Sequence, residues 1–471
     1  MNFKGKKVTV MGIGLHGGAV EMIKWLLAQG AQVVATDLKD AKELVSSLEK
    51  LRGLKNLKIV TGIHRVEDFT KVDMVIKNPA VRWDNEKIKK ALERKIPVEM
   101  DSSLFFKYCP SKKIIGVTGT KGKTTTSLLI AEILKKAGKR VVLVGVGQEN
   151  VMGKLKEIDK ETFVVFELSS WRLSALKRAK VSPFGAVIVN LFQDHLNYYD
   201  NMAEYASDKR AIFEFQKAEN FLVLNIDNFD EKLWDIELKD LKQRLAFFSE
   251  KENFAERVVF IRNDEIIFNW NGKTERLGRI EELKLKGKHN FNNILAASAV
   301  GLFLEIKAQK IWEAVKGFSG TQHRLELIKE IGGVKYYNDT TATTPESGVK
   351  GIQAFTEPIN LIAGGSNKNL DLTVFAEEIA KNEKVKKVYL LEGSATSELK
   401  KMIEKFGGSE KIEGIFNSID EAVVVGSENA VAGEVVLLSP GCASFGMFAN
   451  EFDRGEKFRK AVENIKFGTG E

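Results

Sequence analysis

Short apolar segments alternate with amphipathic segments along the whole chain, and this alternation most limits what the chain can fold into. KVTVMGIG (7–14) precedes an amphipathic stretch that contains Val20, Ile23 and Leu26, and QVVATD (32–37) follows it. Strands that alternate with helical patterns are typical of βαβ units, in which each helix returns the chain so that the strands run parallel. The sequence therefore predicts an α/β protein built on parallel sheets.

Two changes in composition divide this pattern. With 471 residues, the chain can form several domains, each with its own core. A polar stretch, CPSKK at 109–113, comes just before a new apolar segment, and a second break at 319–320 follows a β-rich stretch and a long apolar helix. We therefore predict three domains, which cover residues 1–111, 112–320 and 321–471.

Composition excludes several classes of protein. Apolar residues make up 44% and charged residues 29%, as in soluble globular proteins. The longest apolar stretch, 294–304, is shorter than the ~18 residues that indicate a membrane span. The start of the chain resembles a strand rather than a signal peptide, so we expect no membrane association and a cytoplasmic location. Only Cys109 and Cys442 are present, which argues against disulfides and zinc sites.

The net charge of +8 is spread over the chain in mixed order with acidic residues. Proteins that bind nucleic acid usually gather basic residues on one stripe and interleave aromatic residues. The sequence has no such cluster, so we expect no nucleic-acid partner and favour a small anionic ligand.

GVTGTKGKTTT, at 116–126, resembles a P-loop between a strand and an amphipathic helix. In such loops, backbone N–H groups at the helix start bind phosphate oxygens, a lysine adds a point charge, and a hydroxyl binds magnesium. Lys123 and Thr124 stand in the last two roles. The strict motif is displaced, because Val117 occupies the position of the first glycine. The alternative is a glycine-rich turn that binds nothing.

Three further residues lie where a phosphate site needs them. Glu167 follows one apolar strand, and Asp194 and His195 follow another, so all three can lie at the edge of a parallel sheet where ligands bind. Lys209 falls within the apolar stripe of a helix predicted for NMAEYASDKRAIFEF (201–215). Its ammonium could reach water while its stem packs, or burial could lower its pKa so that the neutral amine is open to modification.

At the N-terminus, Gly12, Gly14 and Gly17 form the pattern GxGxxG after a strand, and Asp37 follows the next strand. This pattern is the Rossmann fingerprint for dinucleotides. It fits NAD, but it fits equally well any nucleotide diphosphate at a helix N-terminus, or a tight turn without a ligand.

GTKGKTTT, ELSSW, DH, KHNFNN, HRLE, YYNDTTATTP, GGSNK and LSPGCASFGMF occur in this order and resemble the Mur ligases over nearly the whole chain. The terminal motifs are most similar to those of the members that add D-glutamate. The resemblance implies a Rossmann-like first domain, a central P-loop domain whose parallel sheet is joined by a smaller β-rich part, and a Rossmann-like last domain. It also implies that the protein acts as a monomer.

The activity implied by the resemblance is an ATP-dependent amide ligation in peptidoglycan precursor synthesis. The carboxylate of UDP-N-acetylmuramoyl-L-alanine is phosphorylated, and the amine of D-glutamate displaces phosphate from the acyl-phosphate. Two Mg²⁺ ions, for which Mn²⁺ could substitute, are implied together with a carbamylated Lys209.

The resemblance also assigns residues. It implies catalytic roles for Lys123, Glu167, His195 and Lys209. It implies that metal is held by Thr124, Glu167, His195 and Lys209. It implies that ATP is bound by Gly119, Thr120, Lys121, Gly122, Lys123, Thr124, Thr125, Asn290, Asn293, Arg324 and Asp339, with His323 beside them. It implies that the UDP substrate is bound by Gly14, Leu15, His16, Asp37 and Asn78. It implies that the incoming amino acid is bound by Thr343, Lys368, Ser444 and Phe452.

The chain departs from the family pattern near the acceptor. Thr341 replaces a usual lysine, Gly446 replaces a usual aspartate, and Gln148 or Asn150 stands in for the usual asparagine of GGNIG. These changes leave open a sister ligase that adds another amino acid. A third alternative is not a ligase. It is a nucleotide-dependent switch or an NAD-binding regulatory protein, which would use only the first two domains.

Overall fold

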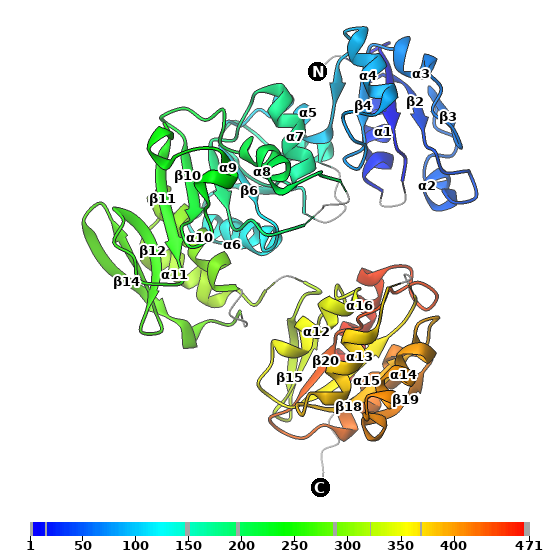
Figure 1. Ribbon diagram of the computed structural model, residues 1–471, viewed down its shortest axis with the longest axis vertical. Coiled ribbons are helices and arrows are strands. Elements are labelled where there is room, and N and C mark those ends of the chain that lie inside the picture. Colours follow the sequence, from blue (N-terminus) through cyan, green and yellow to red (C-terminus); the bar gives the residue numbers. More distant parts are fainter. Residues whose placement is uncertain are drawn as a thin grey trace. The chain divides into compact units, whose positions relative to one another are not determined.

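The computed structural model describes residues 3–14, 17–146, 151–194, 198–285, 290–320, 322–367 and 370–465. It contains three sheets in two compact units, which are considered separately (Figure 1). The first unit comprises Met1–Leu283 and His289–Gly317, and the second comprises Lys284–Lys288 and Phe318–Glu471. The predicted α/β class with parallel sheets is confirmed, whereas the exact domain boundaries stay predictions.

The N-terminal sheet of the first unit has the order β3-β2-β1-β4-β5, and every neighbouring pair is parallel. Its strands are β1 (Lys7–Met11), β2 (Gln32–Thr36), β3 (Leu57–Val60), β4 (Met74–Lys77) and β5 (Val98–Glu99). Its helices are α1 (Gly18–Ala28), α2 (Val45–Glu49), α3 (Glu67–Thr70), α4 (Glu86–Glu93) and α5 (Asp101–Tyr108). The chain order reverses at β1, so the ends of β1 and β4 flank a topological switch point, where ligands bind in such sheets.

The central sheet of the first unit has nine strands in the order β14-β13-β12-β11-β10-β9-β6-β8-β7. Its strands are β6 (Ile114–Thr118), β7 (Val141–Val144), β8 (Phe163–Glu167), β9 (Gly185–Ile188), β10 (Phe221–Asn225), β11 (Arg244–Ser249), β12 (Arg257–Arg262), β13 (Glu265–Trp270) and β14 (Lys273–Arg279). Only β13 and β14 join antiparallel. The β-rich part predicted beside the parallel sheet is thus the outer edge of the same sheet.

Helices α6 (Lys123–Lys136), α10 (Phe291–Phe303) and α11 (Ala308–Gly317) pack together in this unit, as do α7 (Ser170–Ala179), α8 (Met202–Arg210) and the short α9 (Glu231–Trp234) in pairs. Helix α8 is shorter than the sequence pattern predicts. It ends at Arg210, and the buried Ile212 and Phe213 lie in the turns that follow, so the predicted helix over 201–215 was too long. Short 3₁₀ helices cover Met152–Glu157, Leu238–Asp240, Ile280–Glu282 and Ser409–Lys411.

The second unit has one sheet in the order β15-β16-β20-β17-β18-β19, in which only the β15–β16 pair is antiparallel. Its strands are β15 (Glu326–Ile331), β16 (Val334–Asn338), β17 (Ile359–Gly364), β18 (Val385–Leu391), β19 (Ile412–Phe416) and β20 (Val435–Leu438). Its helices are α12 (Pro345–Gln353), α13 (Thr373–Lys381), α14 (Thr396–Lys405), α15 (Ile419–Asn429) and α16 (Glu451–Glu463).

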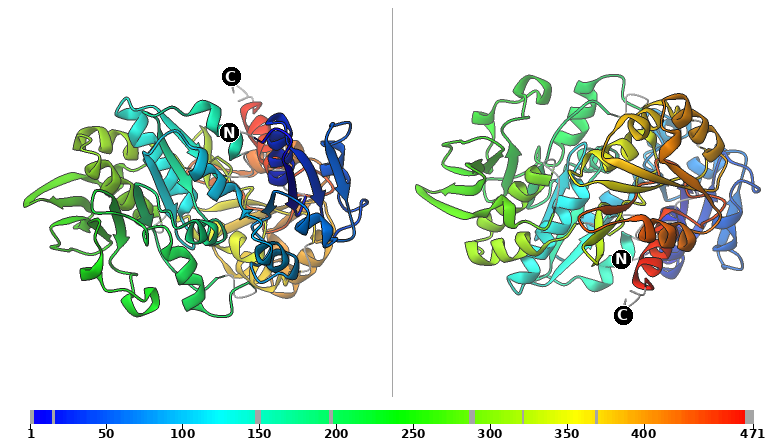
Figure 2. Two further views of the ribbon diagram at one scale, coloured as in Figure 1. Left: turned by 90° about the horizontal axis from the view of Figure 1, so that it is seen from above. Right: turned by 90° about the horizontal axis from the view of Figure 1, so that it is seen from below.

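Helices cover both faces of this sheet, as Figure 2 lets the reader follow. One apolar cluster joins the sheet to α12, α13 and α14, and a second joins it to α15 and α16. Such a doubly wound layout places the carboxyl ends of the parallel strands at one edge, where loops carry the function.

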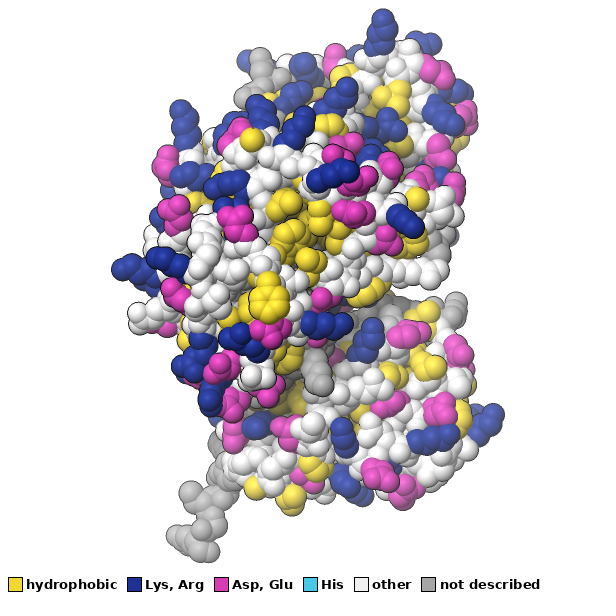
Figure 3. All heavy atoms as spheres, turned by 60° about the vertical axis from the view of Figure 1, so that its left-hand side comes forward, with side chains coloured by type: hydrophobic (Ala, Val, Ile, Leu, Met, Phe, Trp, Pro, Cys, Tyr) yellow, Lys and Arg dark blue, Asp and Glu magenta, His cyan; other side chains and the backbone are white. Residues whose placement is uncertain are grey.

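Two surface properties bear on the partners expected from the sequence. On the face in Figure 3, Lys and Arg side chains are interspersed with Asp and Glu. That distribution matches the mixed charge order of the sequence. Among the helices that the structure describes, none is both long and apolar enough to cross a membrane.

Candidate active site

The loop between β6 and α6 has the backbone of a phosphate-binding turn. Gly122 is the N-cap of α6 with φ 83°, and no side chain caps this helix. The first N–H groups of a helix lack partners within the helix, and they attract anions. A Cβ on Gly122 would lie 2.2 Å from Oδ1 of Asn293, so only glycine fits.

Asn190, which the sequence analysis missed, holds this loop. Its Oδ1 accepts hydrogen bonds from the backbone N–H groups of Thr120 (3.1 Å) and Lys121 (3.0 Å), and its Nδ2 donates to the carbonyl of Lys121 (3.1 Å). Asn190 follows β9, the neighbour of β6 in the sheet. Its place after a parallel strand was the available signal.

The charged and polar side chains of the loop lie at the same edge. The Nζ of Lys123 donates to the carbonyls of Gly119 and Thr120, at 3.0 Å each. The hydroxyl of Thr124 donates to Oε2 of Glu167 at 2.7 Å. Glu167 ends β8, which flanks β6 on the other side from β9. A carboxylate beside a hydroxyl supplies the oxygen ligands that magnesium prefers, so these residues fit a metal beside a phosphate.

Lys209 lies beneath the same loop. Its side chain is 1% exposed, and its Nζ donates to the carbonyl of Gly119 (3.0 Å) and to Oγ1 of Thr118 (3.2 Å). Burial lowers the pKa of Lys209 well below its usual value, and the nearby charge of Lys123 acts in the same direction. The alternative in which its ammonium reaches water is therefore wrong, and a neutral amine next to the phosphate loop is favoured.

The other strand-end residues are only partly described. Oδ2 of Asp194 lies 3.7 Å from the Nζ of Lys121, whereas His195 lies outside the described residues. Within the described part of the chain, no group of three His, Cys, Asp or Glu side chains is arranged to hold a metal. A metal here would therefore need ligands besides the described carboxylates, such as hydroxyl, phosphate or modified-lysine oxygens, or a side chain outside the described residues.

The start of α10 meets the back of the phosphate loop. Oδ1 of Asn293 accepts a hydrogen bond from Oγ1 of Thr126 (3.1 Å), and its Nδ2 donates to Oδ1 of Asn290 (2.9 Å). Both asparagines are buried. The amide of Asn293 is therefore fixed against Gly122, beside the loop to which the family resemblance assigns ATP.

In the second unit, Asp339 follows β16 and is buried. Its Oδ1 accepts from the N–H of Leu325 (3.2 Å), and its Oδ2 accepts from the hydroxyl of Ser439 (2.9 Å). Burial raises the pKa of Asp339 to about 7, although the Ser439 hydrogen bond and the charge of Arg324 oppose the shift. The neighbouring His323 is buried too, which lowers its pKa, and its Nε2 lies 3.3 Å from Oε1 of Glu456.

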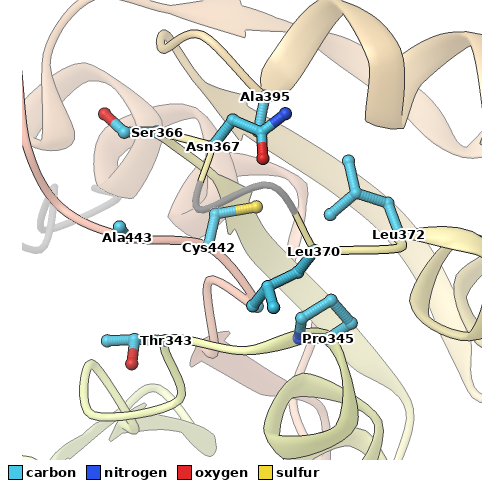
Figure 4. Close-up of a pocket in the computed structure, with 10 residues that line it drawn as sticks. Thr343, Pro345, Ser366, Asn367, Leu370, Leu372, Ala395, Cys442 and Ala443 are labelled. Atoms are coloured by element: carbon cyan, nitrogen blue, oxygen red, sulfur yellow. The ribbon is translucent and has the colours of Figure 1, made fainter.

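Of the acceptor residues implied by the family, Thr343 and Ser444 lie in loops that follow β16 and β20, and Phe452 lies in the first turn of α16. Thr343 lines a small pocket, together with Pro345, Ser366, Asn367, Leu370, Leu372, Ala395, Gly441, Cys442 and Ala443 (Figure 4). Ser444 is buried next to it in sequence, and Phe452 is partly exposed with its ring 5.6 Å from His323. Neither of these two lines the pocket, and Lys368 lies outside the described residues.

Arg454, another residue that the sequence analysis missed, joins two of these loops. Its guanidinium is entirely buried and donates to Oγ1 of Thr340 (3.0 Å), to the carbonyl of Thr340 (2.9 Å) and to the carbonyl of Cys442 (3.3 Å). Burial lowers the pKa of Arg454 to about 10. Because it satisfies carbonyls on both loops, Arg454 fixes their separation.

At the N-terminal sheet, Gly14, Asp37 and Asn78 come together. The N–H of Gly14 donates to Oδ2 of Asp37 at 2.9 Å, and Nδ2 of Asn78 donates to the carbonyl of Gly12 at 3.4 Å. The structure thus gathers three of the five residues predicted to bind the UDP substrate. The other two, Leu15 and His16, lie outside the described residues.

Sequence models of three domain families match the chain in order. They are the MurD-like N-terminal domain of Mur ligases over residues 6–99, the Mur ligase middle domain over 117–301, and the glutamate ligase domain of Mur ligases over 323–442. The chain belongs to the Mur ligase family. The resemblance drawn from the motifs is therefore confirmed.

This Mur ligase is 37% identical over 470 residues to the UDP-N-acetylmuramoylalanine–D-glutamate ligase of Roseiflexus sp. (strain RS-1), with 99% of this chain and 100% of the relative covered. Its fold is similar to that of UDP-N-acetylmuramate–alanine ligase from Thermotoga maritima (TM-score 0.58, 19% identity, 98% and 100% covered). It is also similar to that of the MurF ligase of Thermotoga maritima, solved in complex with ADP (TM-score 0.52, 16% identity, 98% and 96% covered).

Proposed function

We propose that this Mur ligase joins D-glutamate to UDP-N-acetylmuramoyl-L-alanine in an ATP-dependent reaction of peptidoglycan precursor synthesis. One observation carries the proposal: a phosphate loop with Glu167 and a buried lysine at its edge occurs in a chain that matches a D-glutamate ligase over its full length. Neither a switch nor an NAD-binding regulator accounts for the glutamate ligase domain over residues 323–442.

The reaction explains why cations surround the loop. A carboxylate is a poor electrophile, so a carboxylate oxygen of the alanine attacks the γ-phosphorus, ADP leaves, and an acyl-phosphate forms. The D-glutamate amine then attacks the acyl carbon, and the tetrahedral species expels inorganic phosphate and loses a proton. Both steps bring anions together, and Lys123 with the helix N-terminus of α6 lowers that repulsion.

The reaction would use two Mg²⁺ ions, for which Mn²⁺ could substitute. Thr124 and Glu167 would hold one ion, and His195 with a carbamylated Lys209 would hold the other. The ions supply charge that screens the phosphates during transfer. Carbamylation joins the neutral amine of Lys209 to CO₂ and releases a proton, which turns a group that repels cations into an anionic oxygen ligand. The lowered pKa of Lys209 favours the neutral amine that this step needs.

The substrates would be divided among the loops described above. ATP would contact the phosphate loop over 119–125 together with Asn290, Asn293, Arg324 and Asp339. UDP-N-acetylmuramoyl-L-alanine would contact Gly14, Leu15, His16, Asp37 and Asn78. D-Glutamate would contact Thr343, Lys368, Ser444 and Phe452.

A second candidate is a sister ligase that adds a different amino acid. It is favoured by Thr341, which stands where the family usually has a lysine and whose hydroxyl donates to the carbonyl of His323 at 3.0 Å.

A phosphate-release assay with a panel of acceptors tests both candidates. We expect release only when ATP, Mg²⁺, UDP-N-acetylmuramoyl-L-alanine and D-glutamate are all present, and slower release in CO₂-depleted buffer because the carbamate is lost. A faster rate with another amino acid would favour the sister ligase. Release without the UDP substrate would refute ligation altogether.

A further inference from the structure

The segment that joins β4 to α4, residues 78–85, touches both domains of the first unit. It begins at Asn78, whose Cβ lies 2.8 Å from the place where a Cβ on Gly12 would stand, so it packs directly against the glycine loop. It ends at Asn85, whose side chain caps α4. Between these ends, residues 81–83 contact the central domain.

Lys77 stabilises the turn at the start of this segment through hydrogen bonds to its backbone. It is the last residue of β4 and is 2% exposed, and its Nζ donates to the carbonyls of Val81 (2.8 Å) and Asn78 (3.4 Å). The Nζ also lies 4.6 Å from the centre of the Trp83 ring. Burial lowers the pKa of Lys77 to about 7. A buried lysine without such acceptors would be costly, so the turn and the lysine hold each other in place.

Trp83 carries the connection to the central domain. Its side chain packs against the apolar cluster of the N-terminal sheet and its helices, which consists of Met11, Phe69, Val75, Ile88 and Ala91. Its Nε1 donates to Oγ of Ser174 on α7 at 2.8 Å, and the Arg178 guanidinium, also from α7, lies 4.2 Å from the ring centre. One indole is therefore anchored in one domain and hydrogen-bonded to the other, which suits its apolar body and polar edge.

A second contact lies beside the first. Arg82 donates to the carbonyl of Tyr198, and the Tyr198 hydroxyl donates to the carbonyl of Val81 at 3.5 Å. The next residue, Tyr199, donates its hydroxyl to Oδ2 of Asp208 at 3.1 Å, immediately before Lys209 in the chain. Helix α7, which receives Trp83, begins three residues after Glu167. Both contacts thus involve segments that lie next to candidate metal-binding residues in the chain.

We propose that Trp83 is a positioning residue for the UDP-linked substrate, because it sets the separation between the glycine loop and the phosphate loop. This inference rests on the proposed function, in which the uridine diphosphate end of the substrate binds beside Gly14 and its carboxylate reacts beside Lys123. The two ends of one molecule then reach their partners only if the two loops keep a fixed separation. A misplacement of about 1 Å at a reacting centre can cost ~100-fold in rate.

Trp83→Phe and Ser174→Ala test the proposal from opposite sides of one hydrogen bond. Each should raise KM for UDP-N-acetylmuramoyl-L-alanine or lower kcat by about fivefold, the effect of losing one such bond. The Kd of UDP alone, measured by calorimetry, and KM for ATP should stay within about twofold, since each ligand uses one loop. The double variant should be no worse than the worse single variant, because both remove the same bond.

Ile88→Val is the matched control, since it trims the same apolar cluster without touching α7. It should change thermal stability and leave the KM for the UDP substrate unchanged. Equal weakening of UDP and of the whole substrate by Trp83→Phe, or the same KM change in Ile88→Val, would overturn the proposal. A wild-type enzyme that binds UDP but does not turn over the muramoyl substrate would instead refute the proposed function. Since Ser174→Ala removes the bond from the central domain, a misfolded Trp83 variant leaves the test intact.

Discussion

Helices α1 and α6 begin in the same way after a parallel strand, but the side chains beside their first residues have opposite charge. The β1–α1 and β6–α6 loops each join a parallel strand to a helix whose N-cap is a left-handed glycine, Gly17 (φ 81°) or Gly122 (φ 83°), and neither helix has a side-chain cap. The first loop is bound by the carboxylate of Asp37, whereas the second carries Lys123 above the buried Lys209. The shared backbone creates an anion-attracting helix start in both, and the side chains decide how much negative charge each can accept.

The two loops also differ in what lies behind the glycine. Among the described residues, none lies within 4 Å of a Cβ placed on Gly17, whereas a Cβ on Gly122 would collide with Asn293 and lie 3.2 Å from Val189. The phosphate loop is thus packed from behind by α10, and the described part of the first loop is open at this point. This difference fits a loop that must hold a triphosphate rigidly and one that receives the end of a longer ligand.

The charge difference predicts the largest effect. Lys123→Ala should lower kcat by about 10²–10³-fold, because the transferring phosphoryl group loses a preorganised cation. Phosphate release at saturating substrates measures it. Lys135→Ala is the matched control, since it removes the same charge from the exposed last turn of α6 and should leave turnover unchanged. Near-normal turnover of the Lys123 variant would place the chemistry elsewhere.

The sequence predicted the features of these loops that depend on local patterns and on the order of strands, and it missed hydrogen bonds between residues far apart in the chain. The phosphate loop is a local pattern, and the rule that parallel strands end at one edge was enough to predict Glu167 beside Thr124. Helical spacing placed Lys209 in the apolar stripe, but it left open whether the ammonium reaches water, and the helix itself was predicted too long. Asn190 was missed although it follows a parallel strand, because its partners lie 69 or more residues away. Arg454 had no such signal, and its hydrogen bonds to Thr340 cross 114 residues and depend on loop geometry.

The N-terminal sheet shows the same limit. The spacing of the glycines and Asp37 matched the Rossmann fingerprint, but that pattern did not predict the hydrogen bond from Gly14 to Asp37. Nothing in the sequence around Trp83 indicated a bond to Ser174, which lies 91 residues away on another domain. Periodicity specifies the elements, but the pairing of polar side chains between domains depends on how those elements dock.

The difference in packing behind the glycines predicts the next effect. Gly122→Ala should destabilise the first unit by roughly 2–5 kcal/mol, because overpacking against Asn293 adds to the strain of a left-handed alanine. Gly17→Ala should cost only the strain, ~1–2 kcal/mol. Denaturant midpoints of the two variants measure the contrast. Equal losses would mean that the packing behind Gly122 relaxes freely and that the two loops are equally open.

The smallest expected effect concerns Asp37, the acidic residue beside the first loop. Asp37→Asn keeps the shape of the side chain but leaves one acceptor oxygen for the N–H groups of Gly14 and Lys39, so the charge-assisted bond from Gly14 is weakened or lost, at a cost of ~1 kcal/mol. We expect KM for the UDP substrate to rise about fivefold, as that loss implies, while KM for ATP stays unchanged, as steady-state kinetics with each substrate varied in turn would measure. If the diphosphate instead lay directly against Asp37, the variant would remove a charge repulsion and would bind the UDP substrate more tightly. A lower KM would therefore show that the first loop holds phosphate as the second does, and the contrast between the two loops would fail.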